Sequence, residues 1–292
     1  MKKPIKIKKK IKNFLVKLFF SKSFYSFYLF LDPIINFKKK TRKGKQTKLF
    51  SNALDQINTS EFKITSQNNE DGIIEKIFKS VPNKKYFIEI GFSYYECNSL
   101  NLIKNGWSGR MIDINKNESS ALKKILMYYY PSSNVDVVNA KVKKSNINQL
   151  ILVEKNKNID FLSIDIDSND FWILKEIDLS NVSVVCCEYN HWLGRDKKIT
   201  IPYNEDFISL DDGIWGASLL LLTELLNSKG FSLIAVESSG TNAFFVKTKY
   251  TSAFKILSPY TSFKSIGRFF NEDKKKEIFA NIKKNSNLLT YF

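Results

Sequence analysis

One pair of segments constrains the fold of this chain more than any other. The apolar run Tyr86–Ile90 is followed directly by Gly91, and a second apolar run ends in Asp113. An apolar run closed by glycine is typical of a buried strand that ends in a tight turn. In open α/β sheets a nucleoside cofactor lies where the first strand ends, and an acid ending the second strand can bind the ribose hydroxyls. The two segments therefore predict a cofactor-binding α/β domain.

The rest of the chain continues this alternation of strands and helices. Strands are predicted at 86–90, 110–114, 135–139, 159–166 and 182–188, and helices at 72–80, 98–105, 118–130, 147–153, 171–177 and 218–228. Residues 231–236 and 243–247 are predicted to form a closing hairpin that adds an antiparallel edge strand. Strands that alternate with helices imply a parallel sheet. The predicted fold is an α/β, doubly wound, mostly parallel seven-stranded sheet with an antiparallel final hairpin.

The net charge of +17 is concentrated at the N-terminus. Residues 1–48 contain 16 of the 46 Lys and Arg residues and one of the 29 acids, a charge of +15, which leaves 30 bases and 28 acids in the remainder. A nearly neutral body lacks the electrostatic footprint of a nucleic-acid-binding protein, which argues against nucleic acid as a partner. We expect a basic amphipathic arm (1–48), a linker (49–71), an α/β domain (72–250) and a C-terminal helical extension (251–292).

The N-terminal arm interleaves lysines with aromatic and aliphatic residues at helical spacing. Its longest uncharged run, between Lys22 and Asp32, has nine residues, whereas a membrane-spanning helix needs about 18 or more. The pattern favours a helix that lies on an anionic membrane surface; the alternative is an arm that packs on the body. Three cysteines, two of them adjacent, form no even disulfide framework. We therefore expect a cytoplasmic protein, peripheral at the inner face of the membrane.

Several motifs in the body occur together in a characteristic order. They are Phe87–Gly91, Glu96–Asn98, Gly106–Gly109, Ile159–Asp167, Gly216–Leu219 and Asn242–Phe245. In order and spacing they resemble the FkbM-like methyltransferases, within the class I S-adenosylmethionine-dependent methyltransferase fold, over roughly residues 72–248. The resemblance implies S-adenosylmethionine as cofactor and O-methylation of a glycan or glycolipid precursor.

The resemblance also implies roles for individual residues. Glu89 and Gly91 match the motif whose backbone approaches the methionine end of the cofactor, and Asp113 matches the acid that binds the ribose. Asn139 falls where an adenine contact is made, and Asp165 falls where the fourth strand faces both cofactor and substrate. The chain departs from the family after Gly91, where Phe-Ser-Tyr-Tyr replaces further glycines; bulky residues there would crowd a close approach of the backbone to a ligand.

Candidate catalytic residues follow the fourth and fifth predicted strands. Methyl transfer to a hydroxyl needs alignment and a proton acceptor, and the candidates are Asp165, Glu188 and His191. The ordinary pKa of histidine, about 6.5, suits a base, although a single histidine is often structural. Asp165, Asp167 and Glu188 together offer hard oxygen ligands for a divalent cation. The alternative is that Asp167 or Asn169 caps the following helix.

Two other functions remain open at this level. A nicotinamide oxidoreductase would carry a Gly-x-Gly-x-x-Gly turn after the first strand, and none follows Gly91. A membrane-associated module that kept the fold and lost its cofactor is consistent with the run from Phe92 to Tyr95.

Overall fold

The computed structural model describes residues 31, 33, 34, 57–152, 158–210, 212–265 and 270–292. Apart from Leu31, Pro33 and Ile34, the basic arm predicted for residues 1–48 lies outside the described residues. Within the described ranges, no helix combines the length and the apolar character needed to cross a membrane.

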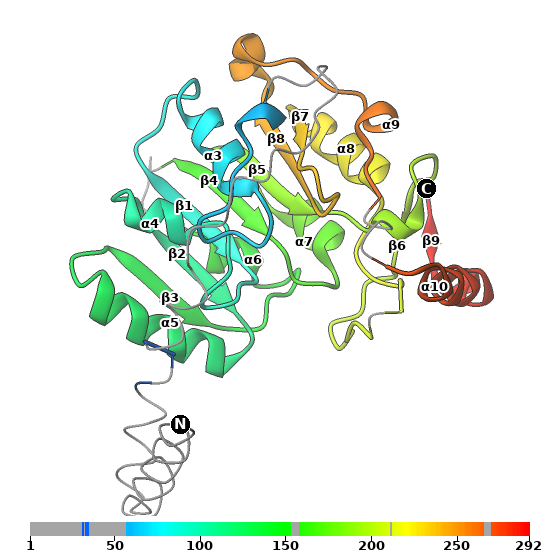
Figure 1. Cartoon of the computed structure of the whole chain (residues 1–292), viewed down its shortest axis with the longest axis horizontal. Coiled ribbons are helices and arrows are strands. Elements are labelled where there is room, and N and C mark those ends of the chain that lie inside the picture. The colour runs from blue at the N-terminus through cyan, green and yellow to red at the C-terminus, as the bar shows by residue number, and fades with distance from the viewer. Residues whose placement is uncertain (1–30, 32, 35–56, 153–157, 211, 266–269) are drawn as a thin grey trace, which may run out of the picture.

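A seven-stranded sheet forms the centre of the structure (Figure 1). Its strands are β1 (Tyr86–Ile90), β2 (Ser108–Asp113), β3 (Val135–Asn139), β4 (Ile159–Ile164), β5 (Val182–Glu188), β7 (Phe231–Val236) and β8 (Asn242–Lys247). They lie in the order β3-β2-β1-β4-β5-β8-β7. Strands β1 to β5 pair in parallel, whereas β8 is antiparallel to β5 and β7. The predicted doubly wound sheet with an antiparallel hairpin is confirmed.

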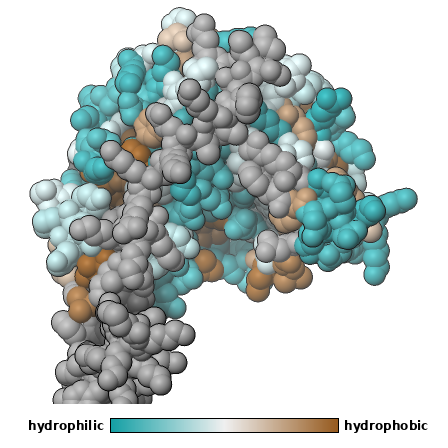
Figure 2. All heavy atoms as spheres, in the orientation of Figure 1, coloured by the Kyte–Doolittle hydropathy of each residue, from teal (hydrophilic) through white to brown (hydrophobic). Residues whose placement is uncertain are grey.

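Helices cover both faces of this sheet (Figure 1). They are α3 (Glu70–Phe78), α4 (Leu100–Lys104), α5 (Lys116–Tyr129), α6 (Ile147–Leu150), α7 (Asp170–Glu176) and α8 (Leu219–Ser228). Because successive strand residues point to opposite faces, the sheet supplies two apolar cores. One core joins alternate strand residues to α3, α4 and α5, and the other joins the remaining ones to α6, α7 and α8. On the face shown in Figure 2, most of the described surface is hydrophilic, and apolar residues form separate patches.

The order of the two hairpin strands along the sheet is a detail that the prediction left open. The second strand of the hairpin, β8, is not the edge of the sheet but lies between β5 and β7. The connection from β5 through α8 leaves a gap one strand wide between β5 and β7. The tight turn at 237–241 then returns the chain into that gap as β8. In this interior position residues 242–246 of β8 are all buried.

The two segments that flank the predicted domain pack against it where they are described. In the predicted linker, the backbone N–H groups of Ile64, Thr65 and Ser66 donate to Asp71 Oδ2 over 2.7–2.9 Å, and this fixes the chain at the start of α3. The C-terminal extension contains α9 (Pro259–Ser262) and α10 (Glu272–Lys284). It ends in β9 (Thr290–Tyr291), which pairs with β6 (Ile199–Thr200) in a second, two-stranded sheet.

Candidate functional site

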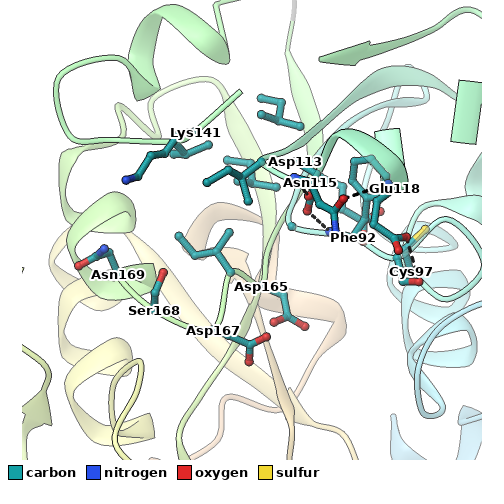
Figure 3. Close-up of a pocket in the computed structure, with 18 of the residues that line it drawn as sticks. Phe92, Cys97, Asp113, Asn115, Glu118, Lys141, Asp165, Asp167, Ser168 and Asn169 are labelled. Atoms are coloured by element: carbon teal, nitrogen blue, oxygen red, sulfur yellow. Dashed lines mark hydrogen bonds between the residues drawn. The ribbon is translucent and has the colours of Figure 1, made fainter. Parts of the chain in front are cut away.

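A cavity of about 510 Å³ lies at the carboxyl ends of the parallel strands (Figure 3). Segments that end or follow β1, β2, β3 and β4 line it, and a loop at 205–207 contributes to its rim. Five of the residues predicted from sequence, Glu89, Gly91, Asp113, Asp165 and Asp167, lie in its wall. This is the edge at which open α/β sheets bind ligands.

Gly91 is required by the packing of two strand ends. Its φ of +79° favours glycine, and a Cβ added there would lie 1.6 Å from the carbonyl oxygen of Asp165. The N–H of Gly91 donates to Ile112 O, and the N–H of Asp165 donates to Ile90 O, both over 2.9 Å. The space that a side chain would fill at this turn is therefore occupied by the backbone carbonyl of Asp165.

Glu89 is buried in the wall of the cavity, where it holds the start of α4. Its two carboxylate oxygens accept from the backbone N–H groups of Asn98 and Ser99, each over 2.9 Å. Burial raises the pKa of Glu89 to about 7, against the lowering effect of these donors. The side chain thus contributes an acidic wall and fixes the turn that follows β1.

The glycine-poor turn after Gly91 is anchored by the two acids beside it. Asp113 Oδ2 accepts from Phe92 N–H over 3.1 Å, and Glu118 Oε2 accepts from Tyr94 N–H over 2.7 Å. The rings of Phe92, Tyr94 and Tyr95 pack against the core on the α3 side of the sheet. Burial raises the pKa of Asp113, although the N–H groups of Asn115 and Phe92 oppose this. The bulky turn is thereby ordered by hydrogen bonds in place of glycines.

Asn139 has a different position from the one expected for an adenine contact. It is exposed and does not belong to the lining; its side-chain amide donates to the carbonyls of Asp113 and Ile114, both over 2.9 Å. It therefore positions the end of β2. The cavity wall here is formed by Ile114, Ala140 and Val142, which sequence analysis missed. Ile114 is 63% exposed, and its place directly after Asp113 was the available signal.

At the other end of the cavity, three carboxylates come together as the sequence predicted. Oxygen atoms of Asp165, Asp167 and Glu188 all lie within 4.8 Å of one another. Burial is the main cause that raises the pKa of both Asp165 and Glu188 well above the usual range, and their carboxylate neighbours add to it. Asn169 precedes α7 but makes no side-chain cap hydrogen bond; its amide bonds to the backbone of Asn204 instead. Asp170 accepts from the N–H groups of Ile166 and Ser168, each over 2.9 Å.

His191 does not join this group. It is 7% exposed, packs against the Trp192 ring at a centroid distance of 4.7 Å, and does not belong to the cavity lining. Burial lowers the pKa of His191 to about 3, so its imidazole is neutral near physiological pH. His191 is therefore a buried packing residue in the segment that follows β5.

The cavity lining is strongly acidic. Among the described residues that form it, seven are acidic and one, Lys141, is basic. The seven are Glu89, Glu96, Asp113, Glu118, Asp165, Asp167 and Glu205. Lys141 Nζ lies 2.6 Å from Asp206 Oδ1, so its charge is largely offset by that pair. Two of the seven acids are also paired, Glu96 with Lys63 and Glu205 with Lys143, each over 2.6 Å, and burial raises the pKa of Glu89, Asp113 and Asp165. Acids still outnumber bases in the lining, and a cleft with an excess of one charge raises the local concentration of ligands of the opposite sign.

No protein-family model and no curated protein sequence matches this chain. Among solved structures, it is similar to the N-terminal domain of EvdMO1 with SAH bound, at 10% identity and a TM-score of 0.43, over 73% of this chain and 92% of that one. It is also similar to magnesium protoporphyrin IX methyltransferase (ChlM) from Synechocystis PCC 6803 with bound SAM, at 9% identity and a TM-score of 0.42, over 77% and 96% of the two chains. A third is M. capricolum TrmK in complex with SAH, at 16% identity and a TM-score of 0.38, over 73% and 81%. At these identities and TM-scores a shared activity does not follow from the likeness.

Proposed function

We propose that this chain is an S-adenosylmethionine-dependent methyltransferase whose cofactor occupies the acidic cavity. The observation that carries the proposal is the combination of place and charge. The cavity lies at the carboxyl ends of β1, β2 and β4, contains the acid that ends β2, and has seven carboxylates against one lysine among its described lining residues. S-adenosylmethionine carries a sulfonium and an ammonium group, so an acidic wall favours it. The same wall repels cofactors that carry several phosphates.

The dimensions and the lining are consistent with this cofactor. A volume of about 510 Å³ falls within the range of roughly 300–1,000 Å³ for small-molecule sites. In the proposed arrangement Asp113 accepts from the ribose hydroxyls, and Ile114 and Val142 cover the adenine. Glu89 and Gly91 flank the methionine end, and Asp165 lies near the transferred methyl group.

A nicotinamide cofactor fits the site less well. Its pyrophosphate is bound by a glycine-rich turn at a helix N-terminus. Here the turn continues as Phe-Ser-Tyr-Tyr, and the free side of Gly91 faces Asp165 O. The remaining alternative is a module that has lost its cofactor, because Asp113 already accepts from the turn and from Asn115.

For the acceptor we propose O-methylation of a glycan or glycolipid precursor at the cytoplasmic surface of an anionic membrane. Support comes from the motif resemblance and from the charge of +15 on residues 1–48. The acceptor hydroxyl would enter at the Asp165–Asp167 end, where a carboxylate takes its proton. His191 is not proposed as the base, because a group with a pKa of about 3 is a weak proton acceptor at neutral pH.

Calorimetry with the full chain tests the cofactor. We expect S-adenosylmethionine and S-adenosylhomocysteine to bind, and NADH not to bind. Asp113→Asn should weaken binding by about tenfold or more, because a hydrogen bond to a charged group contributes about 1.5–3 kcal/mol. Asp136→Asn is the matched control: Asp136 lies on the neighbouring strand β3, outside the cavity, and pairs with Arg110. Absence of binding at millimolar S-adenosylmethionine would overturn the proposal.

Flotation with anionic vesicles tests the membrane separately. The full chain should float, and a chain that begins at Ile57 should not, because the +15 arm has been removed. Raising the salt concentration should release the full chain. Equal flotation of the two chains would contradict a role for the arm.

A further inference from the structure

Two buried oxygen atoms, one at the end of β5 and one at the start of β8, lack hydrogen-bond donors among the residues that the structure describes. They are Glu188 Oε2 and Asn242 Oδ1. Glu188 and Asn242 are direct partners across the antiparallel β5–β8 ladder. Directly opposite residues carry their side chains on one face of the sheet, with Cβ atoms about 4.5–5.5 Å apart. A buried acceptor without a donor costs about 1–3 kcal/mol, so two neighbouring ones call for a ligand.

Asp165 belongs to the same face of the sheet. Ser163 of β4 and Cys186 of β5 are register partners, and Asp165 and Glu188 each follow two residues later along the chain. The oxygens of Asp165, Asp167 and Glu188 lie within 4.8 Å of one another. Figure 3 shows the Asp165 and Asp167 carboxylates together at one end of the cavity, apart from Asp113 and Glu118. Two loop acids and the end of β5 thus converge on one small volume.

The orientation of the Asn242 amide is fixed from behind by Glu70. Asn242 Nδ2 donates to Glu70 Oε1 over 2.9 Å; the two residues are 2% and 0% exposed. A flipped amide would set Oδ1 against the Glu70 carboxylate, with two acceptors in contact. The Nδ2 atom is therefore held at Glu70, and Oδ1 remains as an acceptor on a residue that lines the cavity.

We propose that Asp165, Asp167, Glu188 and Asn242 bind one hard divalent cation, Mg²⁺ or Ca²⁺. All four residues supply oxygen, as these cations require. The cation would satisfy the two buried acceptors at once and offset the mutual repulsion of three carboxylates. Because cation binding can be measured without S-adenosylmethionine, this proposal stands apart from the proposed methyl transfer.

Calorimetric titration of the metal-free full chain with MgCl₂ or CaCl₂ is the test. We expect one cation per chain, and a rise in the thermal unfolding temperature when either cation is present. Asp165→Asn and Asn242→Leu should each lower the affinity by about tenfold or more. Glu118→Gln is the matched control, because it removes a carboxylate from the other end of the same cavity and should leave the affinity unchanged.

Two outcomes would overturn the proposal. One is the absence of binding at millimolar Mg²⁺ and Ca²⁺. The other is an equal loss in Glu118→Gln and Asp165→Asn, which would show a general attraction of cations to the acidic wall. If Asp165→Asn does not fold, Glu70→Gln replaces it: this variant keeps all four ligands but allows the Asn242 amide to turn, and it should also weaken cation binding. Binding of S-adenosylmethionine without binding of either cation would refute this proposal alone.

Discussion

Substitution of Gly91 by alanine tests the central packing contact of the site. In the structure the turn after β1 has no room for a side chain, because an added Cβ would lie 1.6 Å from Asp165 O. Gly106 offers a matched comparison at the end of α4. Its φ is +76°, close to the +79° of Gly91, and no heavy atom lies within 4 Å of an added Cβ.

The comparison of the two variants isolates the steric effect. Both alanines incur the cost of a left-handed backbone, about 1–2 kcal/mol, and both reduce the freedom of the unfolded chain by a similar amount. Only in Gly91→Ala must the contact open from 1.6 Å to at least 3.0 Å. That movement costs about 1–3 kcal/mol as overpacking. It also threatens the Gly91–Ile112 and Asp165–Ile90 backbone hydrogen bonds, each of which contributes about 1 kcal/mol.

We therefore expect Gly91→Ala to lose about 3 kcal/mol more than Gly106→Ala in the free energy of unfolding. Urea denaturation followed by tryptophan fluorescence measures both variants, and equal m-values would show that the same cooperative unit unfolds. A difference below about 1 kcal/mol, smaller than one strained contact should cost, would refute this account of the turn. In that case Gly91 would be needed only to let the backbone come close to a ligand.

Two further predictions concern protonation. Burial raises the pKa of Glu89 to about 7 and that of Asp170 to about 6, from 4.5 and 3.8; the folded chain therefore holds these protons more tightly than the unfolded chain does. Their contribution to stability is complete below the unfolded-state pKa values and is lost as the pH rises through about 6 to 7, up to about 3 kcal/mol for Glu89. The lowered pKa of His191 acts in the opposite direction, but as one group against two. Urea denaturation at a series of pH values should therefore show stability falling between about pH 4 and pH 7, and a rise over that window would contradict the assignment. His191 is the single histidine of the chain, so its ring proton signals in NMR can be assigned directly. They should not shift with pH near neutrality, because the pKa is lowered to about 3, and titration near the ordinary value of about 6.5 would disprove its burial.

Local patterns were sufficient to predict most of the sheet. The strands predicted at 86–90, 135–139 and 182–188 have the same limits in the structure. The first and last of these runs are almost wholly apolar and buried, so strand propensity and burial agree there. The run 135–139 has only Val137 buried, and its valines carry the strand propensity. The position of β8 could not be predicted in this way, because it depends on where the α8 crossover places β7.

The lining of the cavity was predicted in part, for a related reason. The strand-end rule identified Glu89, Gly91, Asp113 and Asp165, since the carboxyl ends of parallel strands meet at one edge. It did not indicate where side chains point beyond that edge. Asn139 turns back to the β2 backbone, and His191 enters the packing.

The sequence alone determined the order of strands and helices and the acids that end β2 and follow β4, because both are written in local periodicity and in residue type. Tertiary structure decided which distant residues share a boundary. The carbonyl of Asp165 fills the place that Gly91 leaves. Ladder pairing sets Asn242 beside Glu188, and Glu70 orients the Asn242 amide. Contacts between residues so far apart along the chain depend on strand order and register, which no local pattern encodes.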